Sequence, residues 1–166
     1  GIMALKELNC GLKRQEREEI ASFILRHSTP DGGFSSLSKA QSGMTNQTSA
    51  AVATLSMLGF GNTIERERVI EFYRTQKESE GGYYATKGGM TPDILSTYTA
   101  CITLCSIGAA GEIETVSILE FIQHLQCPGG GFSGSLLDTE PDTEFTFYGL
   151  ALTALAVIIS DSDYSI

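Results

Sequence analysis

The chain has 166 residues, 42% of them hydrophobic, which is enough apolar material for the core of one folded domain. Its formal net charge is -9 and its pI is about 4.6. This acidity excludes a phosphate-backbone binder, which would need clustered Lys and Arg, so we expect a single domain over residues 1–166 that binds no nucleic acid.

The cysteines and the hydropathy of the chain indicate its compartment. The chain contains four cysteines, which are Cys10, Cys101, Cys105 and Cys127. They show neither CxxC spacing nor the density of a disulfide framework, which favours reduced thiols. No apolar run approaches the length needed to cross a bilayer, and the first residues lack a signal-peptide pattern. We therefore expect a cytoplasmic protein without a transmembrane segment.

A motif of two glycines and an aromatic residue recurs every 49 residues. Its copies are Gly32-Gly33-Phe34, Gly81-Gly82-Tyr83 and Gly130-Gly131-Phe132. Other positions keep the same spacing, namely Ile20, Val69 and Ile118, then Phe23, Phe72 and Phe121, and downstream Thr48, Thr97 and Thr146. Self-similarity at one fixed period predicts a repeat architecture, in which each unit stacks on its neighbours.

Each motif lies between two predicted helices of different character. Apolar residues at helical spacing among Glu and Arg predict outer helices with one solvated face, over 14–27, 64–77 and 112–126. Ala, Leu, Ile, Thr and Cys with almost no charge predict covered inner helices, over 46–58, 94–107 and 142–158. Pro92 and Pro141 fall at the expected first position of the second and third inner helices.

The sequence thus predicts an all-α domain of three helical hairpins, over 14–58, 64–107 and 112–158. The glycine pair permits backbone angles that other residues resist, and the aromatic residue after it can fill the gap between adjacent hairpins. Each hairpin exposes an apolar side, so the two ends of the array need covering.

The units Gln76-x4-Gly81-Gly82-Tyr83 and Gln126-x3-Gly130-Gly131-Phe132 resemble the repeats of protein prenyltransferase β subunits and of squalene and oxidosqualene cyclases. This resemblance implies an α/α toroid and spans roughly residues 15–158. It is closest to the C-terminal half of a geranylgeranyltransferase-type β subunit. Three hairpins would form about half of that ring.

The resemblance also implies where a catalytic zinc would be held in that family, by the Asp and Cys of a Pro-Asp-x-Cys motif and by the His of Asp-x-x-His-Thr. The matching segments here are Pro92-Asp93-Ile94-Leu95 and Asp142-Thr143-Glu144-Phe145-Thr146. Asp93 is retained, but Leu95 and Phe145 stand at the cysteine and histidine positions. Neither side chain has a donor atom for zinc, so we expect a degenerate site, no bound metal and no cofactor.

The family also grips an isoprenoid diphosphate with Arg and Lys ahead of the Pro-Asp motif. Here the loop over residues 83–90 supplies only Lys87. The matching loop of the third repeat carries four carboxylates, on Asp138, Glu140, Asp142 and Glu144, which disfavour a diphosphate substrate. The DxDD motif of class II terpene cyclases does not occur, so their protonation chemistry has only Asp93, Asp142 and Glu144 as candidate acids.

Several of these residues also have a structural interpretation. Asp93 and Asp142 fall in the first turns of inner helices, where carboxylates are favoured by the helix dipole alone. Cys101 and Cys105 lie one turn apart without a nearby His, which favours small core residues over a metal pair. The two histidines, His27 and His124, fall near helix ends and suit capping or surface roles.

Aromatic residues gather at the starts of the inner helices. In a toroid they could line an apolar pocket for an isoprenoid-like ligand, and the candidates are Tyr83, Tyr98, Phe145, Phe147 and Tyr148. Ordinary packing between hairpins is an equally good explanation of the same pattern.

We therefore expect a prenyltransferase-like toroid module without the zinc ligands, which binds a partner chain or an apolar small molecule. The open ends predict a homodimer or a partner polypeptide that completes the ring. The alternative is a zinc-independent enzyme of the terpenoid-cyclase or prenyltransferase type, or one half of such an enzyme. A third possibility is that the chain is part of a longer toroid.

Overall fold

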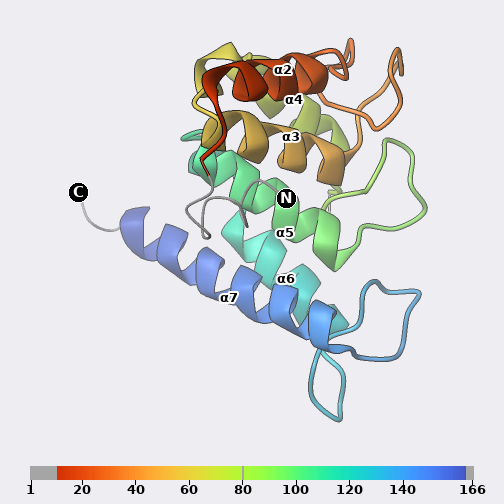
Figure 1. Ribbon diagram of the computed structural model, residues 1–166. Coiled ribbons are helices and arrows are strands. Elements are labelled where there is room, and N and C mark those ends of the chain that lie inside the picture. Colours follow the sequence, from red (N-terminus) through yellow and green to blue (C-terminus); the bar gives the residue numbers. More distant parts are fainter. Residues whose placement is uncertain (1–10, 80, 164–166) are drawn as a thin grey trace.

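The computed structural model describes residues 11–79 and 81–163, and within them the chain is helical without strands (Figure 1). The outer helices are α2 (Arg14–Leu25), α4 (Arg66–Gln76) and α6 (Thr115–Leu125). The inner helices are α3 (Thr45–Met57), α5 (Ile94–Ser106) and α7 (Thr143–Asp163). Short 3₁₀ turns, η1 (Gly61–Thr63) and η2 (Ala110–Glu112), precede α4 and α6. The predicted all-α fold of three hairpins is confirmed.

The helix starts differ in detail from the sequence prediction. Helix α5 begins at Ile94, with Asp93 as its N-cap, so Pro92 lies before the cap and not at the first helical position. Pro141 likewise precedes Asp142, and α7 begins at Thr143. The prediction was wrong here because an aspartate side chain satisfies the first free N–H groups of a helix better than proline does.

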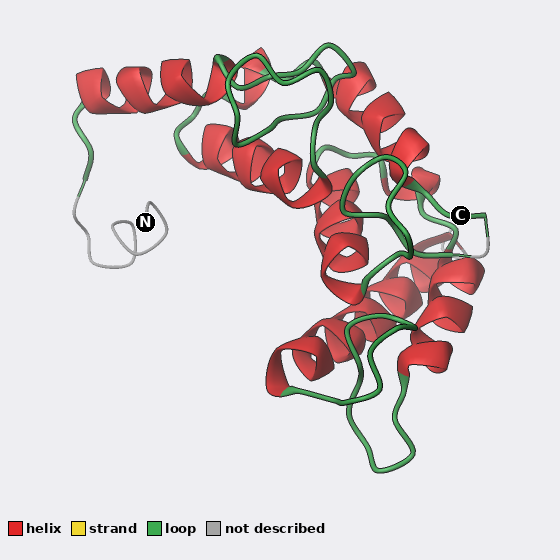
Figure 2. Cartoon of the chain, turned by 90° about the vertical axis from the view of Figure 1, so that its right-hand side faces the viewer, coloured by secondary structure: helices red, strands yellow, loops and turns green. Residues whose placement is uncertain are grey.

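The six helices form two layers that follow an arc (Figure 2). Inner helices contact each other in chain order, with α5 between α3 and α7. Helix α2 packs on α3, and α6 packs on α7. The three long loops that lead into the inner helices all project on one side of the array (Figure 1). The starts of the inner helices therefore share one edge of the molecule.

The outer helices are amphipathic, and each uses its apolar stripe to attach the hairpin to the inner layer. In α4, the side chains of Val69, Ile70, Phe72 and Tyr73 are buried, while its arginines and glutamates face solvent. In α6, the buried side chains are Ile118, Phe121, Ile122 and Leu125. Only Ala21 is fully buried in α2. The first hairpin thus has less of its outer helix covered than the other two.

A single hydrogen bond explains why threonine recurs with the glycine motif. The hydroxyl of Thr48 accepts the N–H of Phe34 at 2.9 Å, and the hydroxyl of Thr97 accepts the N–H of Tyr83 at 2.9 Å. The third copy, from Phe132 to Thr146, measures 3.2 Å. Each bond ties the turn after the glycines to the inner helix, and it satisfies a backbone donor that would otherwise be buried unpaired.

Neighbouring hairpins join through the glycine motif and through the backbone. The ring of Phe72 lies against Gly33, where an added Cβ would come within 2.6 Å of it, and the ring of Phe121 would come within 3.0 Å of a Cβ added to Gly82. Only glycine leaves room for such an approach. The motif therefore serves as the seat for an aromatic side chain of the next outer helix.

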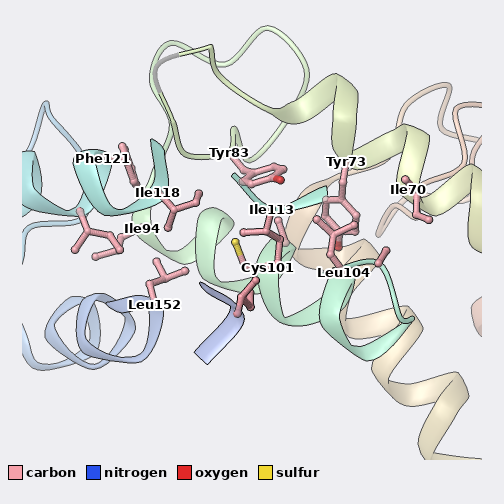
Figure 3. Close-up of a cluster of buried hydrophobic side chains, with 14 of the residues drawn as sticks. Ile70, Tyr73, Tyr83, Ile94, Cys101, Leu104, Ile113, Ile118, Phe121 and Leu152 are labelled. Atoms are coloured by element: carbon pink, nitrogen blue, oxygen red, sulfur yellow. The ribbon is translucent and has the colours of Figure 1, made fainter. Parts of the chain in front are cut away.

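The main hydrophobic core runs between the layers of the second and third hairpins (Figure 3). At its centre, Tyr73 and Tyr83 meet edge to face with ring centroids 6.3 Å apart, next to Cys101 and Leu104. A smaller cluster around Leu55 and Leu58 holds the first hairpin together. The main core takes side chains from all three hairpins, so no single hairpin encloses it, whereas the smaller cluster belongs almost entirely to the first.

Helix α7 is longer and more apolar than the other inner helices. Its stretch Thr143–Asp161 is long and apolar enough to cross a membrane by length and composition, with 17% of the window buried. The expectation that no run reaches such a length is therefore wrong. A core helix of a soluble protein can meet the same criterion, so length and composition alone do not place α7 in a membrane.

Candidate functional site

The candidate site lies where the starts of α5 and α7 meet at the loop edge of the array. Asp93 caps α5, since its Oδ1 accepts the N–H of Ser96 at 2.7 Å. Asp142 does the same for α7, where its Oδ1 accepts the N–H of Phe145 at 2.7 Å. Each carboxylate also faces the positive end of its helix dipole. Both therefore have a structural role, and their role as acids stays a prediction.

Glu144, the third candidate acid, is bound to a tyrosine. Its Oε1 accepts the hydroxyl of Tyr148 at 2.8 Å, one helical turn further along α7. Burial raises the pKa of Tyr148, and the hydrogen bond to the neighbouring Glu144 raises that pKa further. The hydrogen bond to Glu144 orients the ring of Tyr148.

Two of the three positions that would hold zinc in the resembled family, Asp93 and Phe145, are linked through Gly134. The carbonyl of Gly134 accepts the N–H of Ile94 at 2.8 Å, at the first turn of α5. The ring of Phe145 packs directly on Gly134, where an added Cβ would lie 2.6 Å from Cζ. Through Gly134, Phe145 thus lies close to Ile94, the first residue of α5, which follows Asp93. Leu95 is half-buried on the same first turn.

These residues do not fit a zinc ion. Zinc needs nitrogen, sulfur or oxygen donors, and neither the leucine nor the phenylalanine supplies one. One oxygen of Asp93 is already occupied by the helix cap. Within residues 11–79 and 81–163, no three His, Cys, Asp or Glu side chains gather closely enough to hold a metal.

Three of the five predicted ligand-binding residues form one aromatic group. The ring of Tyr98 lies 5.0 Å from that of Tyr148 and 5.9 Å from that of Phe147, measured between centroids. Phe145, in the first turn of α7, is partly buried against the main hydrophobic core, as Tyr98 and Tyr148 are. Phe147 is 57% exposed, whereas Tyr98 and Tyr148 are half-buried, so the group is open to solvent mainly at Phe147. We call Tyr98, Phe145, Phe147 and Tyr148 the aromatic wall.

Tyr83, the fifth predicted ligand residue, lies elsewhere. It is 2% exposed and belongs to the main core beside Tyr73, and burial raises the pKa of its phenol. The 49-residue period was the signal that could have set it apart, because it places Tyr83 at the aromatic position of the glycine motif and not in an inner helix. The structure therefore separates Tyr83 from the aromatic wall.

The cysteines and histidines take the structural roles that their positions suggested. Cys101 is fully buried, and burial raises the pKa of its thiol to about 12, which leaves it protonated and unreactive. Cys105 is half-buried with its pKa raised for the same reason. His27 pairs through Nδ1 with the carbonyl of Phe23 at 2.9 Å, and His124 is exposed in the last turn of α6. Cys10 lies outside the described residues.

One apolar groove was not anticipated from the sequence. It measures about 350 Å³, lies between α2 and α3 on the first hairpin, and is lined mainly by Phe23, Ile24, Phe34, Ala50, Ala51 and Thr54. The repeat could have revealed this groove, because the groove is lined by residues such as Phe23, whose equivalent in the middle hairpin is buried against the preceding hairpin. We call it the head groove.

Comparisons with known proteins agree with this architecture. The sequence profile described as "Prenyltransferase alpha-alpha toroid domain" matches residues 1–165. Among solved structures, Candida albicans protein geranylgeranyltransferase-I complexed with GGPP is similar, with a TM-score of 0.77 and 21% identity. That match covers 89% of this chain and 48% of the other, so this chain spans about half the length of that one. A comparison with curated protein sequences found no significant match.

Proposed function

This chain belongs to the prenyltransferase α/α toroid family, and from that premise we propose that it binds an apolar, isoprenoid-like ligand without zinc-dependent prenyl transfer. The ligand would lie against the aromatic wall at the starts of α5 and α7. We also propose a cytoplasmic location, in keeping with the free thiols of Cys101, Cys105 and Cys127.

The observation that supports this proposal is that two apolar residues stand at the positions where the family would have zinc donors. Leu95 and Phe145 occupy the ligand positions implied by the family, and Phe145 packs against Gly134 at the start of α5. A site changed in this way loses its affinity for a metal and gains affinity for hydrocarbon, because apolar surface is favourably removed from water.

The charges around the aromatic wall select among isoprenoid ligands. The related structure was solved with GGPP, a diphosphate. Here the adjacent loop and helix start carry Asp138, Glu140, Asp142 and Glu144, all exposed. A diphosphate would be repelled by these carboxylates, whereas a neutral prenyl chain would not. The ligand class that fits is therefore an uncharged isoprenoid, such as a prenyl alcohol or a prenyl thioether.

Ligand titration tests this proposal. Geranylgeraniol and GGPP would be titrated against the protein with tyrosine fluorescence as the readout, since the chain contains six tyrosines and no tryptophan. We expect the alcohol to bind more tightly than the diphosphate, and Zn²⁺ to leave both affinities unchanged. Tyr98→Ala and Phe147→Ala should each weaken alcohol binding about tenfold. The matched control is Met90→Ala, because Met90 is 92% exposed and outside the wall.

Two results would overturn the proposal. Tighter binding of the diphosphate would contradict the selection by charge. Turnover of a prenyl diphosphate or of squalene, lost in Asp93→Asn and Asp142→Asn, would instead establish the alternative, an enzyme of the terpenoid-cyclase or prenyltransferase type.

A further inference from the structure

The repeat allows the same position to be compared with and without a neighbouring hairpin. Phe72 and Phe121, on the second and third outer helices, are 0% and 4% exposed because each packs on the glycine motif of the preceding hairpin. Phe23 is the matching residue of the first hairpin and is 57% exposed. It lines the head groove. The first hairpin thus presents a face that is covered in the other two.

The last hairpin presents the complementary face. An added Cβ on Gly32 or Gly81 would collide with a carbonyl of the next outer helix, on Arg68 or Ser117, whereas nothing in the described chain lies within 4 Å of one on Gly130. On the inner layer, Cys101 is 0% exposed and its repeat equivalent, Leu150, is 61% exposed. Together with Phe147 and Val157, both about half exposed, Leu150 forms an apolar stripe along α7.

The backbone shows the register in which two such faces join. The N–H of Thr45 donates to the carbonyl of Ala85 at 2.9 Å, and the N–H of Ile94 donates to that of Gly134 at 2.8 Å. Both bonds link the start of one inner helix to the loop of the next hairpin. The equivalent donor in the third hairpin is the N–H of Thr143, at the start of α7. The residue of the first hairpin that is equivalent to the acceptors Ala85 and Gly134 is Ser36. Ser36 lines the head groove.

We propose that two copies of this chain pair head to tail, with the α7 stripe of each copy in the head groove of the other. In this arrangement Phe23 of one copy packs on Gly130 and Gly131 of its partner, and the backbone carbonyl of Ser36 accepts the N–H of the partner's Thr143. The interface continues the hairpin contact that the chain already makes twice. The interface shares Phe147 with the aromatic wall. Its test uses Phe23 and Leu150, which lie outside that wall, so it stands or falls independently of the proposed ligand.

Two observations favour a second copy of this chain as the occupant of the head groove. Two different faces that meet head to tail close into a ring when each step turns in the same direction. The three hairpins of this chain follow such an arc (Figure 2). One copy also matches 48% of a related toroid chain, so two copies together have about the length of that chain. Six hairpins would then surround one central space, into which the aromatic walls of both copies could face.

The mass of the protein in solution tests this pairing. Sedimentation at micromolar concentration should show a particle of twice 17.8 kDa. Phe23→Asp and Leu150→Asp should each weaken the dimer at least about tenfold, because a carboxylate would be buried in an apolar contact. Both residues are exposed in the single chain, so both variants should keep the helical circular dichroism of the parent. The control is Val116→Glu, at an outer position that is 68% exposed and carries glutamate in the other repeats.

Mixing the variants tests the head-to-tail order. The Phe23→Asp copy retains an intact α7 stripe, and the Leu150→Asp copy retains an intact head groove, so a mixed dimer regains one unaltered interface. Native mass spectrometry with one variant labelled with ¹⁵N should therefore show more mixed than pure dimer.

Three outcomes would overturn the inference. These are a monomer at micromolar concentration, a dimer that Phe23→Asp leaves unchanged, as expected if two α7 helices pair with each other, and an open series of larger oligomers.

Discussion

The middle and the first hairpin contain the same repeat but differ in what surrounds them. Phe72 in the middle hairpin is completely buried against Gly33, whereas Phe23 at the same repeat position is mostly exposed. Tyr73 and Tyr83 of the middle hairpin form the centre of the main core, and the first hairpin relies on a smaller cluster. The comparison teaches that in a stacked array a residue's energetic role is decided by the neighbouring hairpin as much as by its own.

The largest expected effect is the difference between two phenylalanines. Phe72→Ala should lower the free energy of unfolding by about 3–5 kcal/mol, because it leaves a cavity in a fully packed contact. Phe23→Ala should cost less than about 1 kcal/mol at protein concentrations too low for pairing. Urea denaturation followed by circular dichroism would measure both. Equal losses would show that the two hairpins are not distinguished by their neighbours.

A smaller difference is expected for the threonines that hold the glycine turns. Thr97 is fully buried and accepts the N–H of Tyr83, so Thr97→Val should cost about 1–3 kcal/mol through an unpaired backbone donor. Thr146 is half-buried and its bond to Phe132 is longer. Thr146→Val should cost about 0.5–1.5 kcal/mol, since water can replace the lost acceptor. The same denaturation curves provide the comparison, and a greater loss at Thr146 would contradict it.

The smallest effect concerns the ion pairs between the second and third hairpins. Arg74 donates to both oxygens of Glu112, at 2.7 and 2.8 Å, and these hydrogen bonds hold the pKa of Glu112 below its ordinary value. Lys77 lies 2.6 Å from Glu114 and lowers the pKa of that carboxyl in the same way. Both pairs are at the surface, where ion pairs contribute little.

The pH dependence of stability follows from the sign of these shifts. A carboxyl with a lowered pKa in the folded state stabilises the fold above its unfolded pKa of about 4.5, and this contribution is lost as the pH falls through the lower folded value. Melting temperatures should therefore fall below about pH 4.5, and Glu112→Gln should remove part of that fall. Glu120→Gln, at an exposed position on α6, is the control. An identical pH profile in both variants would show that the pair contributes nothing.

Much of the fold could be predicted from the sequence because its causes are local and repeated. The 49-residue period identified the glycine motif, the buried Phe72 and Phe121, and the threonines whose hydroxyls prove to accept the turn N–H groups. Helix type followed from the charge and apolar content of each segment. Pro92 and Pro141 were placed two positions too far into their helices, because capping geometry depends on which side chain finally reaches the free N–H groups.

Less of the candidate site could be predicted. Sequence reasoning named the residues of the aromatic wall but also included Tyr83, which lies in the main core. It identified Leu95 and Phe145 as replacements for ligands, but the contact that brings Phe145 to the start of α5 runs through Gly134, which no motif singled out. The head groove was not anticipated at all.

The sequence by itself determined the repeat unit, because a hairpin's helices, its glycine turn and the threonine bond are all formed within about fifty residues. Only the tertiary structure decided which copies of a repeated residue are covered. Phe23, Phe72 and Phe121 are identical side chains at one repeat position, yet their exposure depends on whether another hairpin lies alongside. Burial is a property of neighbours, and a periodic sequence states which surfaces can pair without stating which of them do.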